Sequence, residues 1–264
     1  MGAIDTSRGR IGCSESGGGD ALPIVFLHGV GSDKRVWRPQ LVHFGHARRA
    51  IAFDYPGYGE SELQPGATRD DFAAAILAAL DALGIGRAHV CGLSLGGVIA
   101  IAMHHAAPER CESLVLADSF AVHPDGPAIR ERGLAASRSI GMRAMAEARA
   151  DVLLAAGADP ALRAEVVGTM ASIDPEAFAI GLEAVWLADQ RDRAAAIRVP
   201  TLVLCGAADT VTPPALSEEL AALVPGARLA LIDGAGHLSN IERPADFNAE
   251  VDRFLAGLEA ESTR

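Results

Sequence analysis

The stretch HVCGLSLGGVIA, residues 89–100, decides the fold of this chain. An apolar, β-branched run ends in GLSLG, and an Ala-rich pattern with helical spacing follows at once. This order predicts a strand, a sharp turn and a helix, with Ser94 at the tip of the turn. Such a turn strains the serine backbone. It also leaves room only for glycine at 92 and 96, because side chains two positions before and after the serine would collide. Ser94 is therefore a candidate nucleophile.

Continuous apolar runs recur on both sides of this stretch, and patterns with helical spacing separate them. The runs, each with the length of a strand, are residues 23–27, 49–53, 113–117, 201–205 and 228–232, and a further short strand is expected over 10–16. Strands without polar alternation are typical of parallel sheets that are buried on both faces. We therefore predict an α/β fold with a doubly wound, mostly parallel sheet.

Between about residues 120 and 196 the strand-like runs disappear. This region is rich in alanine and arginine with helical spacing, and prolines interrupt it at several points. The pattern predicts several short helices inserted after the sixth strand. We expect a core domain built from residues 1–119 and 198–264, with a helical cap over residues 120–197.

Several polar side chains come directly after predicted strands, where α/β sheets place their sites. They are His28, Asp54, Ser94, Asp118, Asp209 and His237. The chain order Ser94, Asp209, His237 predicts a catalytic triad in which His237 takes the proton of the serine hydroxyl. Asp209 would then orient the imidazole. Asp118 also follows a strand and is the alternative acid, whereas Asp54 is expected to cap its own loop.

A nucleophilic serine needs two backbone N–H donors for the oxyanion that forms on the substrate. Leu95 supplies one candidate, since it follows the nucleophile at the start of a helix. Val30 is the second candidate. Its neighbours Gly29 and Gly31 would let the backbone approach the substrate closely, so Gly29 is expected in the substrate-binding site.

The predicted cap offers further substrate-binding candidates. Trp186 lies within it, and its large ring could line the pocket through apolar area and an N–H donor, although packing inside the cap is an equal alternative. Four cap arginines are candidates for binding a substrate carboxylate. They are Arg130, Arg132, Arg138 and Arg143.

Composition excludes several classes of protein. The net charge of −11 and the pI near 5.1 argue against binding to nucleic acid. No apolar run is long enough to cross a bilayer, and the N-terminal residues lack the pattern of a secretion signal.

The four cysteines, at 13, 91, 111 and 205, form no C-x-x-C pair, so we expect neither disulfides nor a metal site. The expected location is a reducing cytoplasm. The oligomeric state is left open.

Taken together, the motifs resemble the α/β-hydrolase superfamily over nearly the whole chain. They are residues 28–31, 57–61 and 92–97, with Asp209 and His237. The 3-oxoadipate enol-lactonases and their esterase relatives are the most similar branch, through residues 92–97, 208–212 and 236–242. Two motifs depart from that branch, with HGVG at 28–31 in place of NSLG and PGYG at 56–59 in place of RGHG.

The residues and the resemblance together predict a serine hydrolase that acts on a small-molecule carboxylic ester or lactone through an acyl-enzyme, without a cofactor. Two other enzymes would share the triad: a C–C bond hydrolase of meta-cleavage products and a cofactor-free perhydrolase. A ligand-binding receptor on the same scaffold, with little turnover, is the alternative from a different class.

Overall fold

Within residues 2–262, the part of the chain that the computed structural model describes, eight strands form one sheet in the order β1-β2-β4-β3-β5-β6-β7-β8. The strands are β1 (Ala3–Thr6), β2 (Gly9–Ser16), β3 (Ile24–Leu27), β4 (Ala50–Phe53), β5 (Ala88–Leu93), β6 (Cys111–Ala117), β7 (Thr201–Gly206) and β8 (Arg228–Ile232). The pairings β1–β2 and β2–β4 are antiparallel, and all others are parallel. The predicted fold class is confirmed.

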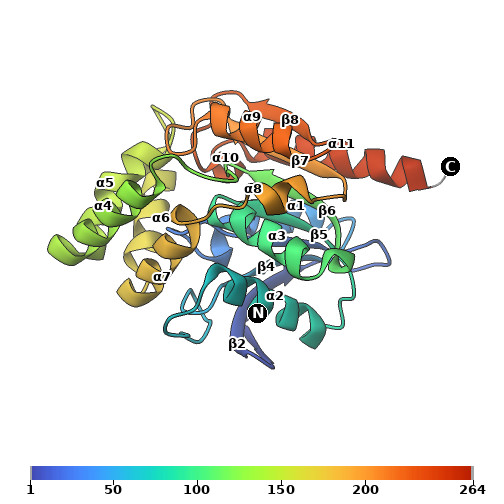
Figure 1. The fold of residues 1–264 in the computed structure, drawn as a ribbon, viewed down its shortest axis with the longest axis horizontal. Helices are drawn as coiled ribbons and strands as arrows, with labels where there is room; N and C mark the ends of the chain where they lie inside the picture. Colours follow the sequence, from blue (N-terminus) through green and yellow to red (C-terminus); the bar gives the residue numbers. More distant parts are fainter. Residues whose placement is uncertain (1, 263–264) are drawn as a thin grey trace.

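The central strands are apolar because both faces of the sheet are covered. Every residue of β3, β4, β5 and β7 is buried. Figure 1 shows helices in front of and behind the sheet: α2, α3, α8 and α9 pack together on one face, and α1 and α11 pack on the other. This arrangement buries α3 almost completely, which explains why the helix after Ser94 is apolar on nearly all sides.

The helices that belong to the sheet layers alternate with the strands along the chain. They are η1 (Lys34–Trp37), α1 (Arg38–Phe44), α2 (Arg69–Ala82), α3 (Leu95–Ala106), η2 (Pro108–Arg110), α9 (Pro214–Leu223), α10 (Ser239–Glu242) and α11 (Pro244–Ser262). Thr68 is the N-cap of α2, since its side chain accepts a hydrogen bond from the backbone of Asp71. The Asp71 carboxylate accepts one from the Thr68 backbone in return, which completes a capping box.

A helical insertion separates β6 from β7, and its first four helices lie to one side of the sheet in Figure 1. It contains α4 (Gly126–Ser139), α5 (Gly141–Leu153), α6 (Pro160–Ala171), α7 (Pro175–Trp186) and α8 (Arg191–Ala195). An isolated antiparallel bridge between Val122 and Asp189 joins its two ends. The helices α4–α7 lie between these ends and are called the cap below, whereas α8 packs against α3 and α9 of the sheet layer.

Strand β1 was not predicted from the sequence. It is four residues long, lies at the edge of the sheet, and alternates between exposed and half-buried side chains. Such a short edge strand is stabilised by its pairing with β2, for example Ile4 opposite Ile11, rather than by an apolar run of its own.

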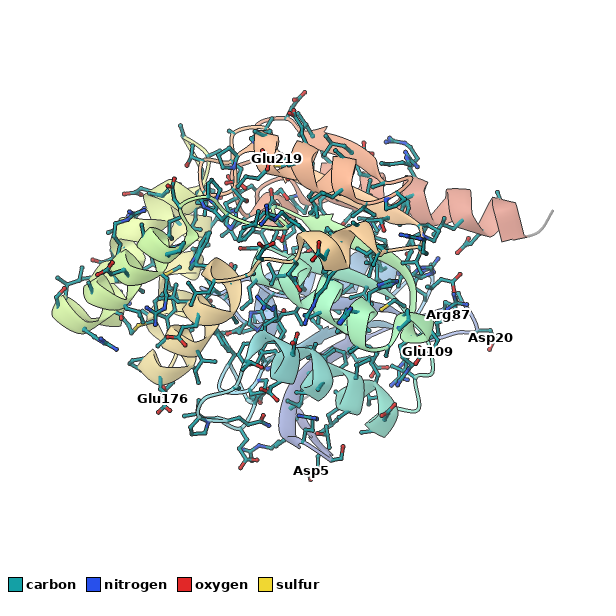
Figure 2. All side chains as sticks on the ribbon, in the orientation of Figure 1. Asp5, Asp20, Arg87, Glu109, Glu176 and Glu219 are labelled. Carbon is teal, nitrogen blue, oxygen red and sulfur yellow. The ribbon has the colours of Figure 1, made fainter. Side chains whose placement is uncertain are left out.

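Acidic residues outnumber basic ones, and the chain carries a net charge of −11. The labelled side chains of Figure 2, such as Asp20, Arg87 and Glu176, are exposed and project from the periphery. In the described part of the chain, no helix has the length and apolarity needed to cross a membrane. Cysteines 13, 91, 111 and 205 are all buried and carry free thiols.

Candidate active site

The turn at Ser94 is as sharp as the sequence predicts. Strand β5 ends at Leu93 and α3 begins at Leu95, so Ser94 is the single residue that connects them. Its backbone angles are φ 55° and ψ −114°. A Cβ atom at Gly92 would lie 2.1 Å from the carbonyl oxygen of Gly96. At Gly96, a Cβ atom would lie 2.0 Å from the carbonyl oxygen of Leu27 in β3. The second glycine is therefore required by the neighbouring strand, not by a clash across the turn.

We expect Gly96→Ala to lower the free energy of unfolding by about 3 kcal/mol, because the new methyl group would overlap the backbone of Leu27 and force β3 and α3 apart. Gly18→Ala is the matched control, since a Cβ atom there meets nothing within 4 Å. Denaturant unfolding measures both variants. Equal stability of the two would show that the turn is not packed against β3 as described.

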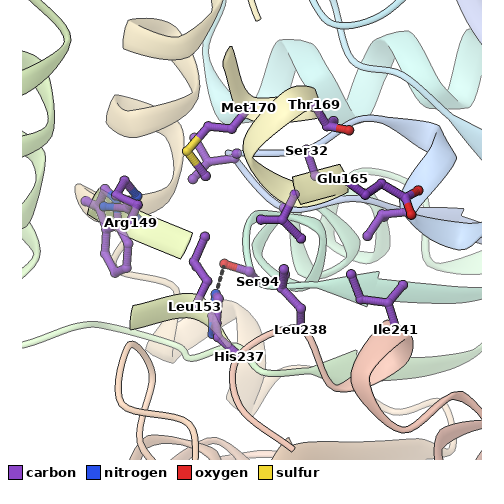
Figure 3. Close-up of a pocket in the computed structure, with 16 residues that line it drawn as sticks. Ser32, Ser94, Arg149, Leu153, Glu165, Thr169, Met170, His237, Leu238 and Ile241 are labelled. Atoms are coloured by element: carbon purple, nitrogen blue, oxygen red, sulfur yellow. Dashed lines mark hydrogen bonds between the residues drawn. The ribbon is translucent and has the colours of Figure 1, made fainter. Parts of the chain in front are cut away.

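Ser94, His237 and Asp209 form a continuous hydrogen-bonded chain at the carboxyl ends of the strands. Ser94 Oγ lies 3.0 Å from His237 Nε2, the contact drawn as a dashed line in Figure 3. His237 Nδ1 lies 2.8 Å from Asp209 Oδ2. Because an ionised carboxylate can only accept hydrogen bonds, Nδ1 carries the proton of the imidazole. Nε2 then accepts a hydrogen bond from the serine hydroxyl. All three residues are at most 3% exposed.

The loop after β7 fixes the Asp209 carboxylate. Its Oδ1 accepts hydrogen bonds from the backbone of Val211 and Thr212, at 2.7 and 3.0 Å, and its Oδ2 accepts one from Thr212 Oγ1 at 2.7 Å. Burial raises the pKa of Asp209, but the charge of His237 and these hydrogen bonds outweigh it, so the pKa lies below its ordinary value. Asp209 is therefore ionised at neutral pH.

The charge of Asp209 acts in turn on His237. Burial alone would lower the pKa of His237, but the neighbouring carboxylate and its hydrogen bond raise it above the ordinary value of 6.5. An imidazole of this kind accepts a proton more readily than a free histidine does. The arrangement can therefore activate a hydroxyl group at Nε2.

Asp118, the alternative acid, does not face the imidazole. Its Oδ1 accepts from the backbone N–H of Gly206 at 2.7 Å, and its Oδ2 accepts from Ser239 Oγ at 2.5 Å. Burial and the charge of nearby Asp209 raise the pKa of Asp118 to about 7. These hydrogen bonds hold the Asp118 carboxylate against β7 and α10, whereas Asp209 is the acid that contacts the imidazole.

The other two strand-end residues hold loops in place. The ring of His28 lies against Tyr55 and Tyr58, and its Nδ1 donates to the carbonyl oxygen of Gly29 at 2.8 Å. Asp54 accepts from the backbone of Glu60 in its own loop, as expected, and also from the backbone and Nζ of Lys34.

The predicted oxyanion donors lie beside Ser94. A Cβ atom on Gly29 would be 3.4 Å from Ser94 Cβ, so this loop passes directly over the serine. Gly29 and Val30 both line the cavity at Ser94, and Leu95 begins α3. Among the described residues, neither Val30 N–H nor Leu95 N–H has a hydrogen-bond acceptor. Neither amide is therefore occupied by a protein group in this part of the chain.

Glu242 ties the histidine loop to the cap, a role that the sequence analysis missed although the residue lies in the 236–242 motif. Its Oε1 accepts from the backbone of Gly236 and Leu238, and its Oε2 accepts from Ala155, just after α5, at 2.7 Å. The backbone N–H of His237 also donates to the carbonyl oxygen of Leu153 at 2.8 Å. The imidazole is therefore positioned by the cap as well as by the core.

A narrow cavity of about 40 Å³ adjoins Ser94 and His237, between the core and the cap. Trp186 lines it and also stacks on Phe120, with the ring centroids 5.6 Å apart. Met170 closes the cavity over Gly31, where a Cβ atom would lie 2.4 Å from Met170 Cε.

The four arginines expected near a substrate carboxylate do not line this cavity. Arg130 pairs with Glu183, Arg143 pairs with Glu147, and Arg132 and Arg138 are exposed. The arginine that does line the cavity is Arg149, which the sequence analysis did not single out.

A mostly parallel sheet covered on both faces, with a serine at a sharp strand–helix turn, defines an α/β hydrolase. The alpha/beta hydrolase family model matches residues 24–250, and the chain belongs to this family of enzymes. It is similar to 3-oxoadipate enol-lactonase 1 of Acinetobacter baylyi, with 30% identity over 242 residues that cover 91% of each chain.

Solved structures show the same relationship. The enol-lactonase from Burkholderia xenovorans LB400 superposes with a TM-score of 0.91 and 30% identity, covering 96% of this chain and 99% of that one. A thermophilic esterase from Thermogutta terrifontis gives a TM-score of 0.88 and 28% identity, covering 97% of both chains. The predicted resemblance to the enol-lactonase and esterase branch is confirmed.

Proposed function

We propose that this protein is a serine hydrolase of carboxylic esters or lactones, with Ser94, His237 and Asp209 as its catalytic triad. The observation that carries the proposal is the unbroken chain of hydrogen bonds from Ser94 Oγ through the imidazole to Asp209. The similarity to proteins named enol-lactonase and esterase supports the choice of substrate.

In the first half of the reaction, Ser94 Oγ attacks the carbonyl carbon while His237 Nε2 takes the hydroxyl proton. The carbonyl oxygen becomes an oxyanion, which accepts hydrogen bonds from the free N–H groups of Val30 and Leu95. Asp209 stabilises the imidazolium. The bond to the leaving oxygen then breaks, and His237 returns the proton to that oxygen. An ester releases its alcohol, whereas the hydroxyl group of a lactone stays attached to the acyl chain.

In the second half, water attacks the acyl-enzyme and His237 Nε2 takes its proton. A second oxyanion forms at the same two amides. When it collapses, the bond to Ser94 Oγ breaks, the serine regains its proton from His237, and the acid leaves. The substrate and one water molecule supply every atom that the products contain.

The cap limits which substrates reach the serine. Trp186, Met170 and Leu153 supply apolar walls to the cavity, and its free volume of about 40 Å³ accommodates only small acyl or alcohol groups without movement of the cap. Trp186 therefore belongs to the proposed substrate-binding site together with Gly29.

Hydrolysis of a neutral aryl ester tests the proposal, and its pH dependence tests the role of His237. The base must be unprotonated, so kcat/KM should fall as the pH drops through the pKa of His237. Since Asp209 raises that pKa, we expect the midpoint of the acid limb above pH 6.5. A midpoint below that value would contradict the described environment of the imidazole, and a lack of turnover would favour a binding protein.

A further inference from the structure

The last turn of α5 is hydrogen-bonded to both loops that carry the proposed triad acid and base. The carbonyl oxygen of Val152 accepts from Thr210 Oγ1 at 3.3 Å, and Thr210 directly follows Asp209. The carbonyl oxygen of Leu153 accepts from the backbone N–H of His237 at 2.8 Å. Carbonyl groups in the last turn of a helix have no partner within the helix. The cap therefore satisfies the end of α5 with groups of the catalytic loops.

Glu242 reinforces this contact from the core. Its Oε1 accepts from the backbone N–H groups of Gly236 and Leu238, at 3.0 and 3.3 Å, which are the two neighbours of His237. Its Oε2 accepts from the N–H of Ala155 in the cap at 2.7 Å. Among the residues that the structure describes, none of these three amides donates to another group. One carboxylate thus links both sides of the catalytic histidine to the cap.

The cap and the histidine loop approach each other so closely that residue 236 must be glycine. A Cβ atom on Gly236 would lie 2.7 Å from the backbone nitrogen of Ala155 and 2.9 Å from the carbonyl carbon of Leu154. It would also lie 3.0 Å from Glu242 Oε1. Backbone therefore packs on backbone here, so a shift of the cap acts directly on the loop that carries His237.

The same end of α5 lies beside the reacting groups. Figure 3 shows Leu153, the last residue of α5, next to the hydrogen bond between Ser94 and His237. Leu153 and Met170 of the cap both line the cavity at Ser94, and its free volume is only about 40 Å³. Entry of a larger substrate requires the cap to move. A movement of α5 away from the core would break its hydrogen bonds to His237 and Glu242.

We propose that Glu242 is a positioning residue: with the last turn of α5, it holds the His237 loop so that Nε2 meets Ser94 Oγ only while these cap contacts are made. The inference rests on the proposed function and adds that closure of the cap assembles the triad. Asp209 holds the imidazole at Nδ1, whereas the backbone of residues 236–238 sets where the ring stands. A misplacement of about 1 Å in a catalytic group can lower a rate by about 100-fold.

Glu242→Gln keeps the size of the side chain but leaves a single oxygen that can accept, so it can serve the cap or the histidine loop but not both. We expect kcat on a neutral aryl ester to fall by about 10- to 100-fold, with KM within about threefold of the wild type. Glu183→Gln is the matched control, because Glu183 pairs with Arg130 inside the cap. It should keep kcat within about twofold. An unchanged kcat in Glu242→Gln would overturn the inference and leave the hydrolase proposal intact.

Acetate distinguishes a positioning role from a general loss of structure. Glu242→Ala lacks a CH₂–COO⁻ group, which acetate matches in size and charge. Added acetate should raise kcat of Glu242→Ala at least about threefold relative to its effect on the wild type, because it can accept from the same amides. Acetamide has one acceptor oxygen and no charge, so it should not. Equal effects of acetate and acetamide would contradict the role of the carboxylate.

Amide hydrogen exchange tests the coupling without turnover and without a folded variant. In the wild type, the amides of Ala155 and His237 should have opening free energies that agree, since one movement of the cap breaks both hydrogen bonds. In Glu242→Gln both should exchange at least about 10-fold faster, and in Glu183→Gln at the wild-type rate. Wild-type protection that differs more than about tenfold between the two amides would show separate openings and overturn the inference. If the wild type hydrolyses no ester, the proposed function fails and these exchange rates alone decide on the coupling.

Discussion

Ser94→Ala is expected to lower kcat on a neutral aryl ester by about 10⁶-fold, the scale on which serine hydrolases lose activity without their nucleophile. The methyl group cannot form the acyl-enzyme, so only water activated by His237 and the free amides of Val30 and Leu95 remain. The fold should persist, because alanine is smaller than serine and the strained backbone at residue 94 is held by the glycines around it.

The control for this variant is Ser137→Ala on α4, whose hydroxyl donates to the carbonyl oxygen of Leu134 within its own helix. It should keep kcat within about twofold, as surface substitutions away from a site usually do. Retention of more than a few per cent of the activity in Ser94→Ala would assign the nucleophile to another group.

Asp209→Asn is expected to lower kcat by about 10⁴-fold, because an amide in this position can hold the imidazole in the wrong tautomer. The matched variant is Asp118→Asn. The Asp118 carboxylate accepts from Gly206 and Ser239 rather than from His237, so this variant should keep most of the activity. A steady-state assay on one neutral ester compares the two. The opposite result would place the acid at the end of β6.

The fold could be predicted from the sequence because its decisive elements are local. The continuous apolar runs that become β3, β5 and β7 are visible without any tertiary information, and so are the glycines at 92 and 96. Strand β1 was missed since its four residues are half exposed and depend on pairing with β2. The reason for Gly96 also required the structure, because its steric neighbour is the carbonyl oxygen of Leu27 in another strand.

For the site, the sequence identified the residues at strand ends and favoured Asp209 over Asp118 by chain order, but it could not show which carboxylate contacts His237. Asp118 and Asp209 follow neighbouring strands, β6 and β7, and only the backbone of each loop decides which carboxylate meets His237. The hydrogen bonds of Glu242 to the cap were equally hidden, since they join residues 87 positions apart in the chain.

The cap was the least predictable part. Its helices are rich in alanine, which is found both on buried and on exposed faces, so the pattern does not reveal which arginine points inward. Arg130 and Arg143 proved to be paired with glutamates, and Arg149 emerged only from the packing of α5 against the His237 loop.

Labelling with a fluorophosphonate probe tests the central claim most directly, because the probe reacts with a serine only when a base and oxyanion donors activate it. Intact-mass analysis and peptide mapping of the wild-type protein should show a single adduct on Ser94. The adduct should be absent in Ser94→Ala and present in Ser137→Ala. Labelling of a different residue, or no labelling of protein that hydrolyses esters, would contradict the assignment of Ser94 as the nucleophile.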